Sequence, residues 1–180
     1  DASSYHTFFF DMATNEPLRG ETHQGFSDDS SWARGQSWAV YGLALCYHYT
    51  HEEAILPLFE RVTKYFIDHL PEDYVPYWDL IFSDGSCEPR DTSAAAIAAC
   101  GILEMEKYYH NQEFLDIAKK MMSSLSEKYT TVDYLQSNGI IKDGMYSRKH
   151  GHKSECTSWG DYFYLEALMR MKKSDWKIYW

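Results

Sequence analysis

The sequence contains no CxxC pair, and none of its apolar runs is long enough to cross a bilayer. Two of the four cysteines, Cys46 and Cys100, lie in apolar stretches that are typical of helices. This placement favours reduced and mostly buried thiols over a disulfide or a zinc site. No signal peptide is visible, and the chain opens at Asp1 without an initiator methionine, which fits a processed or truncated start. We therefore expect a cytoplasmic location.

Positive charge is scarce as well. The chain has 17 Lys and Arg residues against 27 Asp and Glu residues, which gives a formal net charge of −10 and a pI near 5.2. Such a chain repels phosphate backbones and anionic lipids, so we expect neither nucleic acid nor a membrane as a partner. A small polar substrate fits better. With 44% hydrophobic residues, residues 1–180 suffice for one domain with a buried core.

Apolar residues at steps of three and four predict helices through most of the chain. The expected helices cover residues 32–49, 52–69, 94–103, 112–129 and 157–168, with long loops over 71–89 and 130–156. No regular series of strands is visible, although residues 8–10 and 139–141 could pair locally.

Three of the expected helices follow a loop with glycine and charged residues and begin at a hydroxyl side chain. These starts, near Ser31, Thr92 and Thr157, are 61 and 65 residues apart. Asp91 provides a further capping side chain beside Thr92. The period suits a helix, a short turn, a second helix and a long return loop. It predicts an all-α toroid whose inner helices line a cavity, with the long loops gathered at one end beside a pocket.

The densest polar cluster spans residues 23–38. It combines Gln24, Trp32, Arg34 and Trp38 with the start of a helix. Arginine binds carboxylates through two parallel hydrogen bonds, and a helix start adds free amide donors. The two tryptophans could stack on sugar rings while Gln24 meets their polar edges. The cluster therefore suits a uronate.

A purely structural interpretation stands beside this one. Trp38 lies at helical spacing and is as well explained by core packing as by a sugar platform. Arg34 lies in a first helical turn, where positive charge is mildly unfavourable, so an anion is expected near it. Asp28 or Asp29 could be that anion, and capping or pairing explains these two aspartates better than paired-carboxylate catalysis does.

Histidines give weaker signals. His6 lies in a polar-to-aromatic segment without helical pattern, and could relay a proton or donate to a substrate. His150 and His152 with Cys156 form a metal-like fragment, but a clear fourth ligand is missing, and we expect no metal site.

Four strings together resemble the unsaturated glucuronyl hydrolases of glycoside hydrolase family 88. They are HQGFSDDSSWARGQSW at 23–38, YWD at 77–79, RDTSA at 90–94 and WGDYFYLEAL at 159–168. The resemblance runs through nearly the whole chain in the right order, and the first string is the most specific.

The resemblance implies an (α/α)6 toroid, of which this chain would supply roughly the carboxyl-terminal half. It implies a hydrolase that acts on lyase-generated oligosaccharides with an unsaturated uronate at the non-reducing end. An aspartic acid protonates C4, water adds at C5, and the hemiketal opens with release of the unsaturated sugar. No metal or organic cofactor is implied. The two aspartates of the family lie upstream of the segment that resembles 4–7, so the upstream half of the barrel is an expected partner.

Residue by residue, the resemblance places His6, Gln24, Trp32, Arg34 and Trp38 in contact with substrate. Arg34 would hold the uronate carboxylate. His6 is the catalytic candidate, and both His6 and Gln24 would form hydrogen bonds near the reacting carbons. Two alternatives stay open: an unsaturated rhamnogalacturonyl hydrolase with the same fold, and a non-catalytic half barrel that binds carbohydrate or is only structural.

Overall fold

The computed structural model describes residues 1–173 and 175–178. Within that part the chain forms a two-stranded hairpin, five α-helices and one turn of 3-10 helix, η1. The elements in chain order are β1 (Thr7–Phe10), β2 (Pro17–Glu21), α1 (Ala33–Thr50), α2 (Ile55–Asp68), α3 (Thr92–Met105), α4 (Gln112–Lys128), η1 (Arg148–His150) and α5 (Ser158–Lys172). The five expected helices are confirmed, with ends shifted by a few residues.

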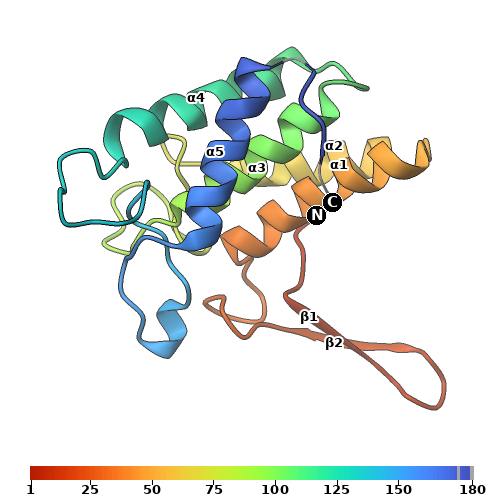
Figure 1. Cartoon of the computed structure of the whole chain (residues 1–180). Helices are drawn as coiled ribbons and strands as arrows, with labels where there is room; N and C mark the ends of the chain where they lie inside the picture. Colours follow the sequence, from red (N-terminus) through yellow and green to blue (C-terminus); the bar gives the residue numbers. More distant parts are fainter. Residues whose placement is uncertain (174, 179–180) are drawn as a thin grey trace.

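Helix α3 is the centre of the helical array and packs against α1, α4 and α5 (Figure 1). All of its residues except Leu103 are buried. Its alanines and Gly101 have little side chain, so neighbouring backbones can approach closely. A Cβ atom added at Gly101 would lie 2.8 Å from the backbone of Tyr41 on α1. Helices α1, α3 and α5 thus form one layer, while α2 packs on α1 and α4 on α3.

The two long loops gather at the amino-terminal ends of α1, α3 and α5, as the repeat predicted (Figure 1). The first amide of α1, at Ala33, donates to the Trp78 carbonyl over 3.1 Å. The first amide of α3, at Thr92, donates to the Asp143 carbonyl over 3.1 Å. Both loops therefore satisfy helix starts through their own backbones.

The expected side-chain caps are present at two helix starts and absent at the third. Asp91 accepts from the Ser93 amide at the start of α3, and Thr157 accepts from the Gly160 amide at the start of α5. The prediction of a hydroxyl cap at Ser31 is wrong, because Trp32 is the N-cap of α1 and makes no side-chain cap bond. Here the loop backbone replaces the side chain.

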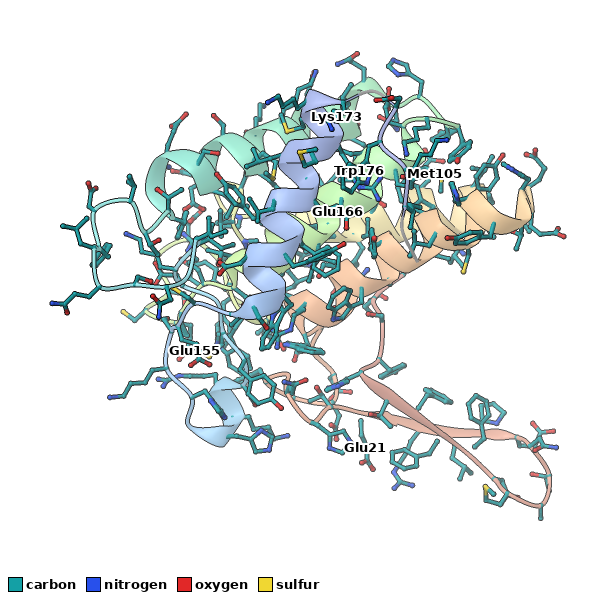
Figure 2. The ribbon with its side chains drawn as sticks, viewed as in Figure 1. Glu21, Met105, Glu155, Glu166, Lys173 and Trp176 are labelled. Atoms are coloured by element: carbon teal, nitrogen blue, oxygen red, sulfur yellow. The ribbon has the colours of Figure 1, made fainter. Side chains whose placement is uncertain are left out.

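Strands β1 and β2 form a hairpin that projects away from the helices (Figure 1), and Figure 2 labels Glu21 at its β2 end. The expected local pairing of residues 8–10 is confirmed, since Phe8 pairs with Gly20 and Phe9 with Arg19. Residues 139–141 instead make only an isolated bridge, between Ile141 and Thr130. Strand β2 was not predicted because a proline and a glycine interrupt the residue pattern that is typical of a strand.

All four cysteines are free, and only Cys100 is buried. The expectation of mostly buried thiols is wrong. Cys46 lies on the outer side of α1, and Cys87 and Cys156 lie in the long loops. In the described residues, no helix combines the length and apolar character needed to cross a membrane.

Candidate functional site

Four of the five predicted site residues meet at the amino-terminal end of α1. The His6 ring lies 4.5 Å from the Trp32 ring, centre to centre, and the Arg34 guanidinium carbon lies 4.6 Å from the same indole. The backbone amide of Gln24 donates a hydrogen bond to His6 Nδ1 over 3.3 Å. Residues 6 and 24 are close because the β1–β2 hairpin connects them and brings the chain back.

The base of the hairpin fixes the protonation of His6. Its Nδ1 accepts hydrogen bonds from the amides of His23 (3.2 Å) and Gln24 (3.3 Å). Partial burial lowers the pKa of His6, and electrostatic interactions with His23 and Arg34 lower this pKa further. The ring is therefore neutral near pH 7, with its proton on Nε2, and that N–H is available as a donor.

Arg34 is buried, with 3% of its surface exposed. Its Nη1 donates to Asp91 Oδ2 over 2.6 Å and to the Met145 carbonyl over 2.7 Å, and its Nη2 donates to the Tyr146 carbonyl over 2.7 Å. Asp91 is itself fully buried. This guanidinium thus joins the starts of α1 and α3 to the loop before η1.

The anion expected beside Arg34 exists, but its predicted identity is wrong. It is Asp91, which lies on the neighbouring inner helix, rather than Asp28 or Asp29. Asp28 instead accepts from the Thr22 amide over 2.8 Å and caps no helix. Packing of α1 on α3 determines the pairing, and sequence proximity does not.

Two indoles contact the guanidinium. Besides Trp32, Trp159 in the first turn of α5 lies over Arg34, with 5.2 Å between its ring centre and the guanidinium carbon. Its indole N–H donates to Ser93 Oγ over 3.2 Å. The exposed Tyr146 ring lies 5.9 Å from Trp159. Sequence reasoning missed Trp159 and Tyr146 as site residues, although Trp159 directly follows Ser158 just as Trp32 directly follows Ser31.

The loop of residues 22–30 is held from two sides. Gln24 Nε2 donates to the Tyr146 carbonyl over 2.8 Å, so this carbonyl accepts from both Gln24 and Arg34. On the other side, Asp79 Oδ2 accepts from the Phe26 amide (2.8 Å) and from Ser30 Oγ (2.7 Å). Asp79 is fully buried, which makes this anchor rigid.

Trp38 lies one helical turn beyond Arg34 on α1 and is 37% exposed. One edge packs on Phe163 of α5, with ring centres 5.2 Å apart, and the rest of the indole is accessible. Within the described residues, no ring contact or hydrogen bond joins Trp38 to His6, Gln24 or Arg34. Trp38 is therefore partly packed and partly free, which satisfies neither interpretation alone.

In residues 1–173 and 175–178, no group of three or more His, Cys, Asp or Glu side chains is arranged to hold a metal ion. His150 contacts Ser147, and His152 packs on Tyr146. The described residues of the site provide hydrogen-bond donors and acceptors, one buried ion pair and aromatic side chains.

Residues 2–174 match the family model described as Glycosyl Hydrolase Family 88. The unsaturated chondroitin disaccharide hydrolase of Streptococcus pneumoniae (strain ATCC BAA-255 / R6) is 50% identical over 186 residues, which cover 100% of this chain and 47% of that protein. The chain thus spans about half the length of the curated relatives that it matches.

Solved structures agree with the sequence match. A variant of unsaturated glucuronyl hydrolase from Streptococcus agalactiae, in complex with dGlcA-GalNAc6S, is 48% identical with a TM-score of 0.87 and is matched over 100% of this chain and 49% of its own. A second structure, described as UGL with dGlcA-Glc-Rha-Glc, is 40% identical with a TM-score of 0.91, over 97% of this chain and 48% of its own. The helices are about half of an (α/α)6 toroid, and the chain belongs to glycosyl hydrolase family 88.

Proposed function

We propose that the protein carrying this chain releases the 4,5-unsaturated uronate from the non-reducing end of lyase-generated glycosaminoglycan oligosaccharides. The observation that carries the proposal is the convergence of His6, Gln24, Trp32 and Arg34 at one helix start. Relatives of the same family that are about half identical are unsaturated chondroitin disaccharide hydrolases, and one relative was solved with dGlcA-GalNAc6S.

The proposed chemistry is hydration of the enol ether. A carboxylic acid gives its proton to C4, water adds its oxygen to C5 and loses a proton, and the resulting hemiketal opens to a ketone with release of the leaving sugar. The family resemblance assigns the acid to helices outside residues 1–180. His6 contributes a neutral Nε2–H donor near the reacting carbons, and Gln24 adds a second polar group beside it.

Arg34 has two functions in this proposal. Three of its N–H groups bond to Asp91 and to the carbonyls of Met145 and Tyr146, which holds the loops that form the site. The remaining N–H groups, on Nε and Nη2, are those left for the uronate carboxylate. Trp32, which contacts both His6 and Arg34, shapes the same sugar site, and Trp38 shapes the next one.

The chain forms the carboxyl-terminal part of a single barrel domain in this proposal, and the rest of the barrel covers an apolar face. Trp38 on α1 and Tyr162 and Leu165 on α5 are 37%, 41% and 46% exposed, although they belong to inner helices. Large apolar side chains at such positions are normally covered. Four free cysteines, three of them exposed, support a reducing compartment and hence the cytoplasm.

The test is turnover of an unsaturated chondroitin disaccharide by the complete protein, followed as loss of absorbance from the double bond. We expect turnover, and a loss of about 10²-fold or more in kcat for His6→Ala, because a positioned donor contributes at least that much. Faster turnover of an unsaturated rhamnogalacturonyl disaccharide would favour the related hydrolase instead. Binding of the chondroitin disaccharide without turnover would favour the non-catalytic interpretation.

A further inference from the structure

A hollow of about 290 Å³ is bounded in part by the loops that form the His6 site. It is lined by Phe26, Trp78, Glu88, Arg148 and Lys149. Two of its walls are loops that also form the His6 site: Phe26 follows Gln24 by two residues, and Arg148 follows Tyr146 by two. Trp78 and Glu88 come from the loop of residues 71–89.

The two loops are bonded to each other at this place. Lys149 Nζ donates to the Thr22 carbonyl over 3.2 Å, and Gln24 Nε2 donates to the Tyr146 carbonyl over 2.8 Å. The hollow and the His6 site therefore share two loops that are bonded to each other.

Aromatic side chains form the apolar part of the hollow. Phe26 is 54% exposed, so its ring is accessible to a ligand. Trp78 lies beneath it, with ring centres 6.3 Å apart and planes at 69°, and its indole N–H donates to Glu88 Oε2 over 2.9 Å. Trp78 is buried and supports the Phe26 ring, whose exposed side suits the apolar face of a sugar.

Charge gives the hollow its selectivity. Arg148 and Lys149 provide two cations against the single carboxylate of Glu88, whose Oε2 lies 3.5 Å from Arg148 Nε. The hollow is thus locally positive on a chain with a net charge of −10. Cations concentrated in this way attract an anionic ligand.

We propose that this hollow binds the third sugar of the substrate, the second one beyond the cleaved bond, through an anionic group on that sugar. This proposal rests on the proposed function. In glycosaminoglycans, uronates alternate with amino sugars, so the third sugar of an unsaturated tetrasaccharide carries a carboxylate. The volume lies at the lower limit of ordinary ligand pockets, about 300 Å³, which suits one sugar ring.

The experiment measures kcat/KM of the complete protein for a tetrasaccharide and for the disaccharide with the same first two sugars. Their ratio is the quantity of interest, because general damage to the site affects both substrates alike. We expect the ratio to exceed about ten in the parent protein, equivalent to about 1.4 kcal/mol. It should fall to about one in Arg148→Ala, and also fall in Phe26→Ala. Lys153→Ala removes an exposed cation of the same loop that does not line the hollow, and should keep the parent ratio.

Substrates separate the sources of the negative charge. An unsulfated tetrasaccharide with a uronate third sugar should gain over its disaccharide, whereas dGlcA-Glc-Rha-Glc, whose third sugar is neutral, should not gain over its own disaccharide. A gain restricted to sulfated tetrasaccharides would identify sulfate as the anion. A ratio near one for every tetrasaccharide, or one that Arg148→Ala and Phe26→Ala leave unchanged, would overturn the proposal.

Failure of the proposed function gives a different result. If the complete protein turns over neither substrate, calorimetric binding of the two saccharides replaces kinetics. Tighter binding of the tetrasaccharide that Arg148→Ala removes would then uphold the subsite, and equal binding would reject it.

Discussion

The buried pair of Arg34 and Asp91 leads to the sharpest stability prediction. Asp91 is fully buried, and Arg34 Nη1 lies 2.6 Å from its carboxylate. Asp91→Ala leaves the guanidinium charge buried and unpaired, which costs about 3–5 kcal/mol of unfolding free energy. It also removes the N-cap acceptor of α3, which is normally worth about 1 kcal/mol, although the two losses will not add fully.

The assay is denaturant unfolding of the complete protein and four variants: Asp91→Ala, Arg34→Met, the double variant, and Asp28→Ala as the matched control. Asp28 accepts one part-buried backbone hydrogen bond, so its loss should cost about 1 kcal/mol. The double variant Arg34→Met/Asp91→Ala no longer holds an unpaired charge. It should therefore be more stable than the sum of the single losses predicts, by about 2 kcal/mol.

Two results would refute this reasoning. One is an Asp91→Ala variant no less stable than Asp28→Ala. The other is additivity of the Arg34 and Asp91 losses, which would mean that the two side chains are not coupled.

Three further predictions concern the site. Arg34→Ala should reduce kcat/KM more for the carboxylate substrate than for its methyl ester, and the difference in transition-state stabilisation should be about 1.5–3 kcal/mol. Equal losses would mean that Arg34 serves only to hold the loops with Asp91. Trp38→Phe should raise KM at a nearly unchanged melting temperature if its exposed face binds sugar, and lower the melting temperature at unchanged KM if its contact with Phe163 dominates. Because the pKa of His6 is lowered, kcat/KM should not fall near pH 6.5, where histidines usually titrate. It should fall only at lower pH, where protonation of Nδ1 removes the acceptor for two backbone amides. A fall centred at or above about pH 6.5 would contradict a neutral His6.

Helix periodicity and capping residues were enough to predict the five helices and the end at which the loops gather. These features depend on neighbours in sequence, and so the sequence alone displays them. The same local signals failed at Ser31, where a distant loop backbone replaces the cap. They also failed for strand β2, whose proline and glycine hide the pairing.

Long-range contacts account for what the sequence did not reveal in the site. The partner of Arg34 is 57 residues away, and Trp159 reaches Arg34 only because α5 packs beside α3. The carbonyl of Tyr146 carries no side-chain signal at all, although it accepts bonds from both Arg34 and Gln24. Residue types could therefore indicate a carboxylate-binding cluster, but not which groups hold it together.

The proposed function requires that residues 1–180 supply only part of the hydration site and that the rest of the barrel supplies the other part. The direct measurement is loss of absorbance from an unsaturated chondroitin disaccharide with the complete protein and with the 180-residue chain alone, each checked for its oligomeric state. We predict turnover by the complete protein, and no turnover by the chain alone, which should self-associate through the exposed face around Trp38 and Leu165. Clear turnover by a monomeric 180-residue chain would contradict the account and would return Asp28, Asp29 and His6 as the catalytic candidates.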